Sequence, residues 1–110
     1  MGSVGSDQLT VKRKYKMRES IKLFAEAMER KLQRDDGKKK GWEACDIQYL
    51  SGGLWEELFE LEDAIANMSI DSGGVSHVLE ECTDVANFAM MIFCVLHDRA
   101  KMFKRGKRDI

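Results

Sequence analysis

Five acidic residues fall into two short clusters whose spacing suits metal binding. Glu56, Glu57 and Glu60 form the first cluster, and Glu81 and Asp84 form the second. Residues three and four positions apart share one face of a helix, where unpaired carboxylates repel one another. A divalent cation would offset that repulsion, and hard oxygen ligands favour Mg²⁺ or Mn²⁺ over zinc. The alternative is an acidic helix face that contacts only solvent.

Charge is segregated along the chain around these clusters. Residues 41–98 contain twelve acidic residues and no lysine or arginine. Residues 11–40 carry twelve basic and five acidic residues, and residues 99–110 carry six basic residues and one acid. Basic flanks can attract nucleic acid or anionic lipid, or hold a triphosphate beside a metal site. No nucleic-acid recognition motif accompanies them, so we do not expect a nucleic-acid partner.

Helices are the only regular structure that the sequence predicts to position these carboxylates. The chain has no proline, no useful strand alternation and no internal repeat. The expected helices run from about Lys14 to Arg34, from an N-cap at Asp46 to about Asn67, and from about Val75 to Phe103. Gly52 and Gly53 mark either a break in the second helix or a close approach of another backbone.

The predicted fold is one small all-α domain that self-associates. A chain of 110 residues buries only about two-thirds of its unfolded surface on folding, and three helices of this length hardly close a core alone. We therefore expect a helical hairpin-type domain that completes a four-helix-type bundle by dimerisation, as a homodimer or higher homo-oligomer. Residues 1–13 are expected to form a flexible leader, residues 14–103 the domain, and residues 104–110 a basic tail.

Apolar stripes on the predicted helices locate the expected core. At roughly 100° per residue, the stripe of the second helix contains Leu54, Leu58, Leu61 and Ile65. The stripe of the third helix contains Val78, Cys82, Val85, Ala89, Ile92 and Leu96, and that of the first Ile21, Phe24, Ala25, Met28 and Leu32. Glu57 and Glu81 lie at stripe edges, with Glu60 and Asp84 next to them. Antiparallel packing of the second and third helices would bring these four carboxylates to one site.

Cysteine use and hydropathy predict a cytoplasmic protein. Cys45, Cys82 and Cys94 cannot pair completely and lack metal-type spacing, so we expect reduced, buried thiols. The apolar run from Val85 to Leu96 has twelve residues and is too short to span a bilayer. No signal peptide is visible, and no membrane association is expected.

The order and spacing of the acidic residues resemble a known enzyme family. The pattern Glu56-Glu57-x-x-Glu60, a twenty-residue gap and Glu81-x-x-Asp84 resembles the signature of MazG-type all-α nucleoside triphosphate pyrophosphatases. Gly41-Trp42 before the first cluster, and the run Asp84-Val85-Ala86-Asn87-Phe88-Ala89-Met90-Met91, resemble the short single-domain MazG-like proteins. The resemblance covers roughly Leu32 to Leu96.

This resemblance implies a hydrolase that cleaves a nucleotide between its α and β phosphates. The implied reaction is Mg²⁺-dependent and converts an NTP or dNTP to the monophosphate and pyrophosphate. By position in the motif, the metal ligands would be Glu57, Glu60, Glu81 and Asp84. Glu56 would be the general base or a residue that orients the metal ligands without binding the ion itself.

Substrate contacts must supply cations that the acidic middle of the chain lacks. Lys38, Lys39 and Lys40 are candidates for binding the pyrophosphate group, although the same run also suits a solvated loop. Trp42 could stack on a base or pack against the helices. Asn87 lies one turn beyond Asp84 in an apolar stretch, which favours a contact with a ligand or nucleotide.

Two other functions are alternatives for a helical domain of this kind, and the sequence argues against one of them. A catalytically silent protein of the same fold would bind a nucleotide or a partner protein without turnover. A di-iron carboxylate bundle requires Glu-x-x-His pairs, and neither His77 nor His97 follows a glutamate at that spacing. The presence of all five motif carboxylates favours the enzyme.

Overall fold

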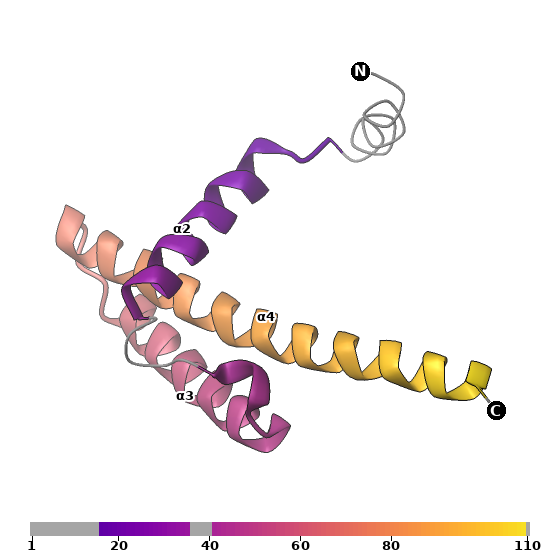
Figure 1. Ribbon diagram of the computed structural model, residues 1–110. Helices are drawn as coiled ribbons and strands as arrows, with labels where there is room; N and C mark the ends of the chain where they lie inside the picture. The colour runs from indigo at the N-terminus through magenta and orange to yellow at the C-terminus, as the bar shows by residue number, and fades with distance from the viewer. Residues whose placement is uncertain (1–15, 36–40, 110) are drawn as a thin grey trace.

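Three α-helices and one short 3-10 helix make up the regular structure of the chain. A computed structural model describes residues 16–35 and 41–109, with side chains up to Phe103. The elements are α2 (Glu19–Asp35), η1 (Trp42–Ala44), α3 (Ile47–Ala66) and α4 (Ser72–Asp109) (Figure 1). No strand occurs in these residues, which confirms the predicted all-α class.

The ends of α3 coincide with the sequence signals that predicted them. Asp46 is the N-cap in an extended conformation, and its carbonyl accepts the first helical hydrogen bond from the Leu50 amide at 3.1 Å. Asn67 is the C-cap, and its side-chain amide donates to the Asp63 carbonyl at 2.9 Å. The helix between these caps is unbroken.

The other two helices differ from their predicted bounds. The α2 helix begins at Glu19 because the Arg18 carbonyl accepts hydrogen bonds from Ile21 and Lys22; the predicted start at Lys14 lies outside the described residues, and residues 16–18 are not helical. The α4 helix begins at Ser72, where the Asp71 carboxylate accepts a hydrogen bond from the Gly74 amide at 2.9 Å. It continues through Asp109, six residues beyond its predicted end.

The helices pack as a hairpin with one helix laid across it. Figure 1 shows α3 antiparallel to the first half of α4, while the second half of α4 extends beyond α3. The C-terminal end of α2 crosses α4, and its N-terminal end projects away from the hairpin. Within the described residues α2 packs against α4 and not against α3. The α4 helix is therefore the element that holds the other two together.

The apolar core is small and lies where η1 closes the open end of the hairpin. Leu50, Met91 and Val95 are buried, and they are surrounded by half-buried side chains from α2, η1, α3 and α4. Gly53 belongs to this contact region, because a Cβ atom there would overlap the ring of Phe88. The α3 helix is thus unbroken at both glycines, and Gly53 marks a close approach of the Phe88 side chain and not of another backbone, whereas Gly52 has no atom within 4 Å of its Cβ position.

The predicted apolar stripes match the buried faces only in part, since Leu32 and Ile92 pack against the core whereas other members are exposed. Ile65 on α3 and Leu96 on α4 are exposed, Ala89 is exposed as well, and α2 has no buried residue. The buried α4 residues among those described are Glu81, Thr83, Asn87, Met91 and Val95. The reason is that α2 and α3 pack on the sides of α4 that carry Asp84, Asn87 and Met91, away from the side that carries Ala89 and Leu96.

The cysteines and the hydropathy of the helices complete this description. Cys45, Cys82 and Cys94 are unpaired. Each is half-buried, whereas the sequence predicted fully buried thiols. None of the helices in the described part of the chain has the length and apolar character needed to cross a membrane.

Candidate metal site

The α3 and α4 helices bring three carboxylates of the two clusters together. One oxygen each from Glu57, Glu81 and Asp84 lies within 4.8 Å of the other two. Glu57 comes from α3, and the other two lie one turn apart on α4. Glu81 is 8% exposed, which is unusual for an acidic residue. Three of the four predicted metal ligands therefore share one site.

Several oxygen atoms at this site are buried without a hydrogen-bond partner. They are Oε1 of Glu57, Oε1 of Glu81 and Oδ1 of Asn87. Asn87 is 4% exposed, and its amide nitrogen donates to the Met28 carbonyl at 3.4 Å, which leaves the oxygen free. Buried oxygens are normally paired, and unpaired ones call for an explanation such as an ion. The donor set, made of carboxylate and amide oxygens, fits Mg²⁺ or Mn²⁺.

The burial and proximity of these carboxylates raise the pKa values of Glu57 and Glu81. Burial, together with the negative charges of Asp84, Glu60 and Glu81, raises the pKa of Glu57 to about 7. Burial also raises the pKa of Glu81, with added repulsion from Glu60 and Asp84. His77, whose Nε2 lies 3.9 Å from Glu81 Oε2, acts in the opposite direction on Glu81. A cation at the site would favour the charged forms that burial disfavours.

A lysine that sequence reasoning missed borders the cluster. Lys31 of α2 is 17% exposed, and its Nζ lies 3.1 Å from Asp84 Oδ1 and 3.5 Å from Glu80 Oε1. Burial alone would lower the pKa of Lys31, but its hydrogen bonds and attraction to Asp84 and Glu80 outweigh burial and raise that pKa. Arg34, one turn along α2, approaches Glu80 at 4.0 Å. The three-residue spacing of Lys31 and Arg34, which places both on one face of α2, was the sequence signal that could have identified these basic residues.

A small cavity of about 130 Å³ adjoins the cluster. Its walls include two predicted metal ligands, two predicted substrate contacts and the newly found lysine, namely Glu57, Asp84, Trp42, Asn87 and Lys31. Trp42 also packs against the apolar core, so one face of this side chain serves the fold and another borders the cavity.

The remaining predicted site residues lie further out. Glu60 is exposed and outside the three-oxygen cluster, although it borders a second cavity of about 290 Å³ together with His77 and Glu81. Glu56 is exposed on α3 and is not part of the cluster. Lys38, Lys39 and Lys40 lie outside the described residues.

Comparisons of the chain with protein-family models, with curated proteins and with solved structures gave no match.

Proposed function

We propose that this protein is a Mg²⁺-dependent nucleoside triphosphate pyrophosphohydrolase of the MazG-like type. It would cleave an NTP or dNTP between the α and β phosphates and release the monophosphate and pyrophosphate. The observation that carries the proposal is the cluster of Glu57, Glu81 and Asp84, in which two carboxylates present buried oxygens without partners. The order and spacing of the acidic motif support the reaction class.

In this proposal the carboxylates of α3 and α4 divide the work. Glu57, Glu81 and Asp84 hold the ion, and Glu60 joins them by turning its exposed side chain inward. A bound Mg²⁺ neutralises phosphate charge and acidifies a water molecule. Glu56 accepts the proton of the attacking water or supports the ligands from behind. The exposure of Glu56 leaves its carboxylate accessible to water.

The substrate would bind between α2 and the hairpin. Lys31 is well placed to contact a phosphate oxygen, because it already lies against Asp84 in a cavity that also borders Glu57. Lys38, Lys39 and Lys40 follow α2 in the sequence and would add further cations. Trp42 would stack on the base and the free oxygen of Asn87 would accept a hydrogen bond from the nucleotide or coordinate the ion.

The proposal includes self-association and a cytoplasmic setting. The core of the described chain contains only four buried apolar residues, while many large apolar side chains are exposed. A homodimer or higher homo-oligomer would cover part of that surface. The cytoplasm would supply both nucleotide and Mg²⁺.

A catalytically silent nucleotide-binding module is the second candidate function. The observation that favours it is the ion pair between Lys31 and Asp84, which gives a ligand carboxylate a counter-ion without any metal. A silent protein would bind nucleotide at the same site and release no pyrophosphate.

The decisive experiment measures pyrophosphate release from a panel of NTPs and dNTPs, with and without Mg²⁺. Wild-type protein should release pyrophosphate only with the metal, and Glu57→Gln should abolish release. Glu62→Gln is the matched control, because Glu62 is an exposed carboxylate on the same helix outside the cluster. Nucleotide binding without release would identify the silent module. Failure to bind Mn²⁺ would overturn the enzyme, and failure to bind nucleotide would overturn both candidates.

A further inference from the structure

One face of α4 carries a long apolar stripe that the described residues leave largely exposed, with only Cys82 and Ala86 half-buried. Its nine members alternate at spacings of four and three residues: Val75, Leu79, Cys82, Ala86, Ala89, Phe93, Leu96, Ala100 and Phe103. We call this set the α4 stripe. Its five largest members expose between 41% and 74% of their surface. Alternating spacings of four and three are the heptad repeat of coiled coils.

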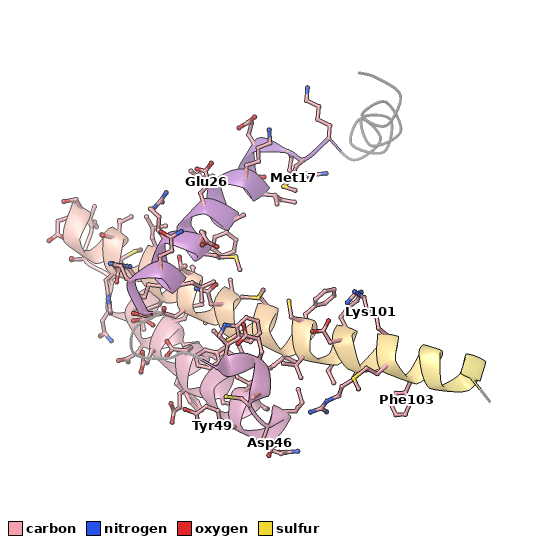
Figure 2. The ribbon with its side chains drawn as sticks, in the orientation of Figure 1. Met17, Glu26, Asp46, Tyr49, Lys101 and Phe103 are labelled. Carbon is pink, nitrogen blue, oxygen red and sulfur yellow. The ribbon has the colours of Figure 1, made fainter. Side chains whose placement is uncertain are left out.

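The length of the α4 stripe separates it from ordinary surface apolar residues. From Val75 to Phe103 it extends over four heptads, which is about 42 Å at 1.5 Å per residue. Soluble proteins rarely leave a continuous apolar surface of that size uncovered. Figure 1 shows that the second half of α4 extends beyond α3, and Figure 2 shows Phe103 on that uncovered part. The stripe therefore has the form of a helix-pairing surface.

We infer that a second copy of this chain covers the α4 stripe, with the two α4 helices antiparallel. This inference specifies the surface of the homodimer in the proposed function. It rests on the packing of α4 and not on the metal chemistry.

Side-chain size favours the antiparallel orientation. The middle of the α4 stripe is small, with Cys82, Ala86 and Ala89 in succession, whereas the bulky Phe93 follows it. Antiparallel helices set Phe93 of each copy against the small segment of the other. Parallel helices would set Phe93 against Phe93 and leave voids between the small residues. Large side chains packed against small ones fill a helix interface without voids.

Charge favours the same orientation. Residues 72–98 of α4 contain four acids and no lysine or arginine, whereas residues 99–109 contain six basic residues and one acid. An antiparallel pair keeps the two basic ends apart and sets each beside a segment of α4 without lysine or arginine, where Glu81 is buried and Glu80 and Asp84 already pair with Lys31. A parallel pair would set two basic ends side by side, which is unfavourable.

A groove between α2 and α4 extends the surface for the second copy. The groove has a volume of about 870 Å³, and its apolar lining includes Leu23, Phe24 and Ala27 of α2 together with Leu79 and Cys82 of the α4 stripe. In an antiparallel pair, the C-terminal part of the other α4 lies along this end of the stripe. Its apolar residues can then enter the groove, whose one acidic residue, Glu80, is already paired with Lys31 and Arg34 of the same copy.

The test is the oligomeric state of full-length Phe93→Glu measured without metal or nucleotide. Sedimentation should give wild-type protein twice the chain mass of 12.6 kDa and the variant a single chain mass. The dimer dissociation constant should rise at least about hundredfold, because a charge would be buried in the seam. Phe59→Glu is the matched control, since Phe59 is 64% exposed against 67% for Phe93 and lies on α3. Circular dichroism checks that both variants keep their helices.

Other outcomes overturn the inference. They are a monomeric wild type, an undisturbed dimer in Phe93→Glu, or loss of the dimer in Phe59→Glu alone. Orientation is tested by raising NaCl from about 50 to 500 mM, which screens surface charge. Salt should strengthen a parallel dimer, because it screens the repulsion between the two basic ends, and should leave the affinity of an antiparallel dimer nearly unchanged. Neither measurement uses turnover, so failure of the proposed reaction leaves both results interpretable.

Discussion

The two faces of α4 depart from the usual polarity of an amphipathic helix, although Met91 and Val95 on the inner face belong to the apolar core. The face toward α2 and α3 buries Glu81, Thr83 and Asn87, whereas the exposed face carries Phe93 and Phe103. A surface helix normally turns its apolar side inward and its polar side toward solvent. The inner face therefore combines a small apolar core with buried polar groups that the core does not require. In the functions proposed above, the buried polar groups belong to the site and the exposed apolar groups are covered by a second copy.

The buried polar residues of α4 are themselves not alike. Thr83 is satisfied within the helix, because its hydroxyl donates to the Leu79 carbonyl at 3.0 Å. Glu81 and Asn87 each keep an oxygen without a partner. Unpaired buried oxygens lower the stability of a protein, so their persistence at one place supports a ligand site there.

The largest expected effect on stability comes from the small core. Leu50→Ala should lower the free energy of unfolding by about 3 kcal/mol, because Leu50 is 1% exposed and its loss leaves a cavity. Leu79→Ala, on the exposed α4 stripe, should change unfolding only at protein concentrations where the dimer forms. Urea denaturation at two protein concentrations measures both. Equal, concentration-independent losses would mean that the two faces are equivalent.

Adjacent glycines on α3 offer a sharper contrast at the inner face. Gly53→Ala should destabilise the protein by about 2 kcal/mol, because the added Cβ would overlap the Phe88 ring. Gly52→Ala should stabilise it by about 0.5 to 1 kcal/mol, because no atom lies within 4 Å of its Cβ position and alanine favours helix. Thermal unfolding of the two variants tests the contact. The opposite order would place the close approach elsewhere.

The buried lysine at the inner face should affect substrate binding. Lys31→Met should raise the KM for nucleotide about tenfold, which corresponds to about 1.4 kcal/mol, because a cation beside Asp84 is lost. Mn²⁺ binding to the nucleotide-free variant should be unchanged or tighter, since a competing positive charge has gone. Lys22→Met, on the exposed part of α2, is the control. Weaker Mn²⁺ binding with an unchanged KM would show that Lys31 only supports the ligands.

The smallest effect expected is a pH dependence of the metal-free protein. The pKa of Glu57 is raised by burial to about 7 from an ordinary value of 4.5, so the folded state holds a proton that the unfolded state releases. The contribution of Glu57 to the free energy of unfolding is therefore complete below about pH 4.5 and is lost as pH rises through 7. After allowance for solvent screening, the loss should be about 1 kcal/mol. Saturating Mg²⁺ should remove this loss of stability, and Glu57→Gln should flatten the dependence of stability on pH. An unchanged slope in that variant would assign the pH dependence to another group.

Sequence predicted the helices better than their contacts. Asp46 and Asn67 end α3 through local backbone chemistry, which sequence reveals directly. The spacing of Glu57, Glu81 and Asp84 likewise required only helical periodicity and an antiparallel hairpin. The buried side of α4 was missed because periodicity identifies an apolar stripe without showing whether the same chain covers it. Lys31 was missed because its partner Asp84 lies 53 residues away.

The position of the carboxylates along the hairpin has a mechanical consequence. One end of the α3–α4 pair is fastened by the core around Leu50 and Val95, and the other by the short capped turn between Asn67 and Asp71. The carboxylate cluster lies between these two ends, near the middle of the α3–α4 pair. The backbones of α3 and α4 at Glu57 and Asp84 can therefore separate only if the helices bend, so in the proposed metal site the stiffness of the hairpin would leave mainly side-chain rotation to adapt to ions of different radius.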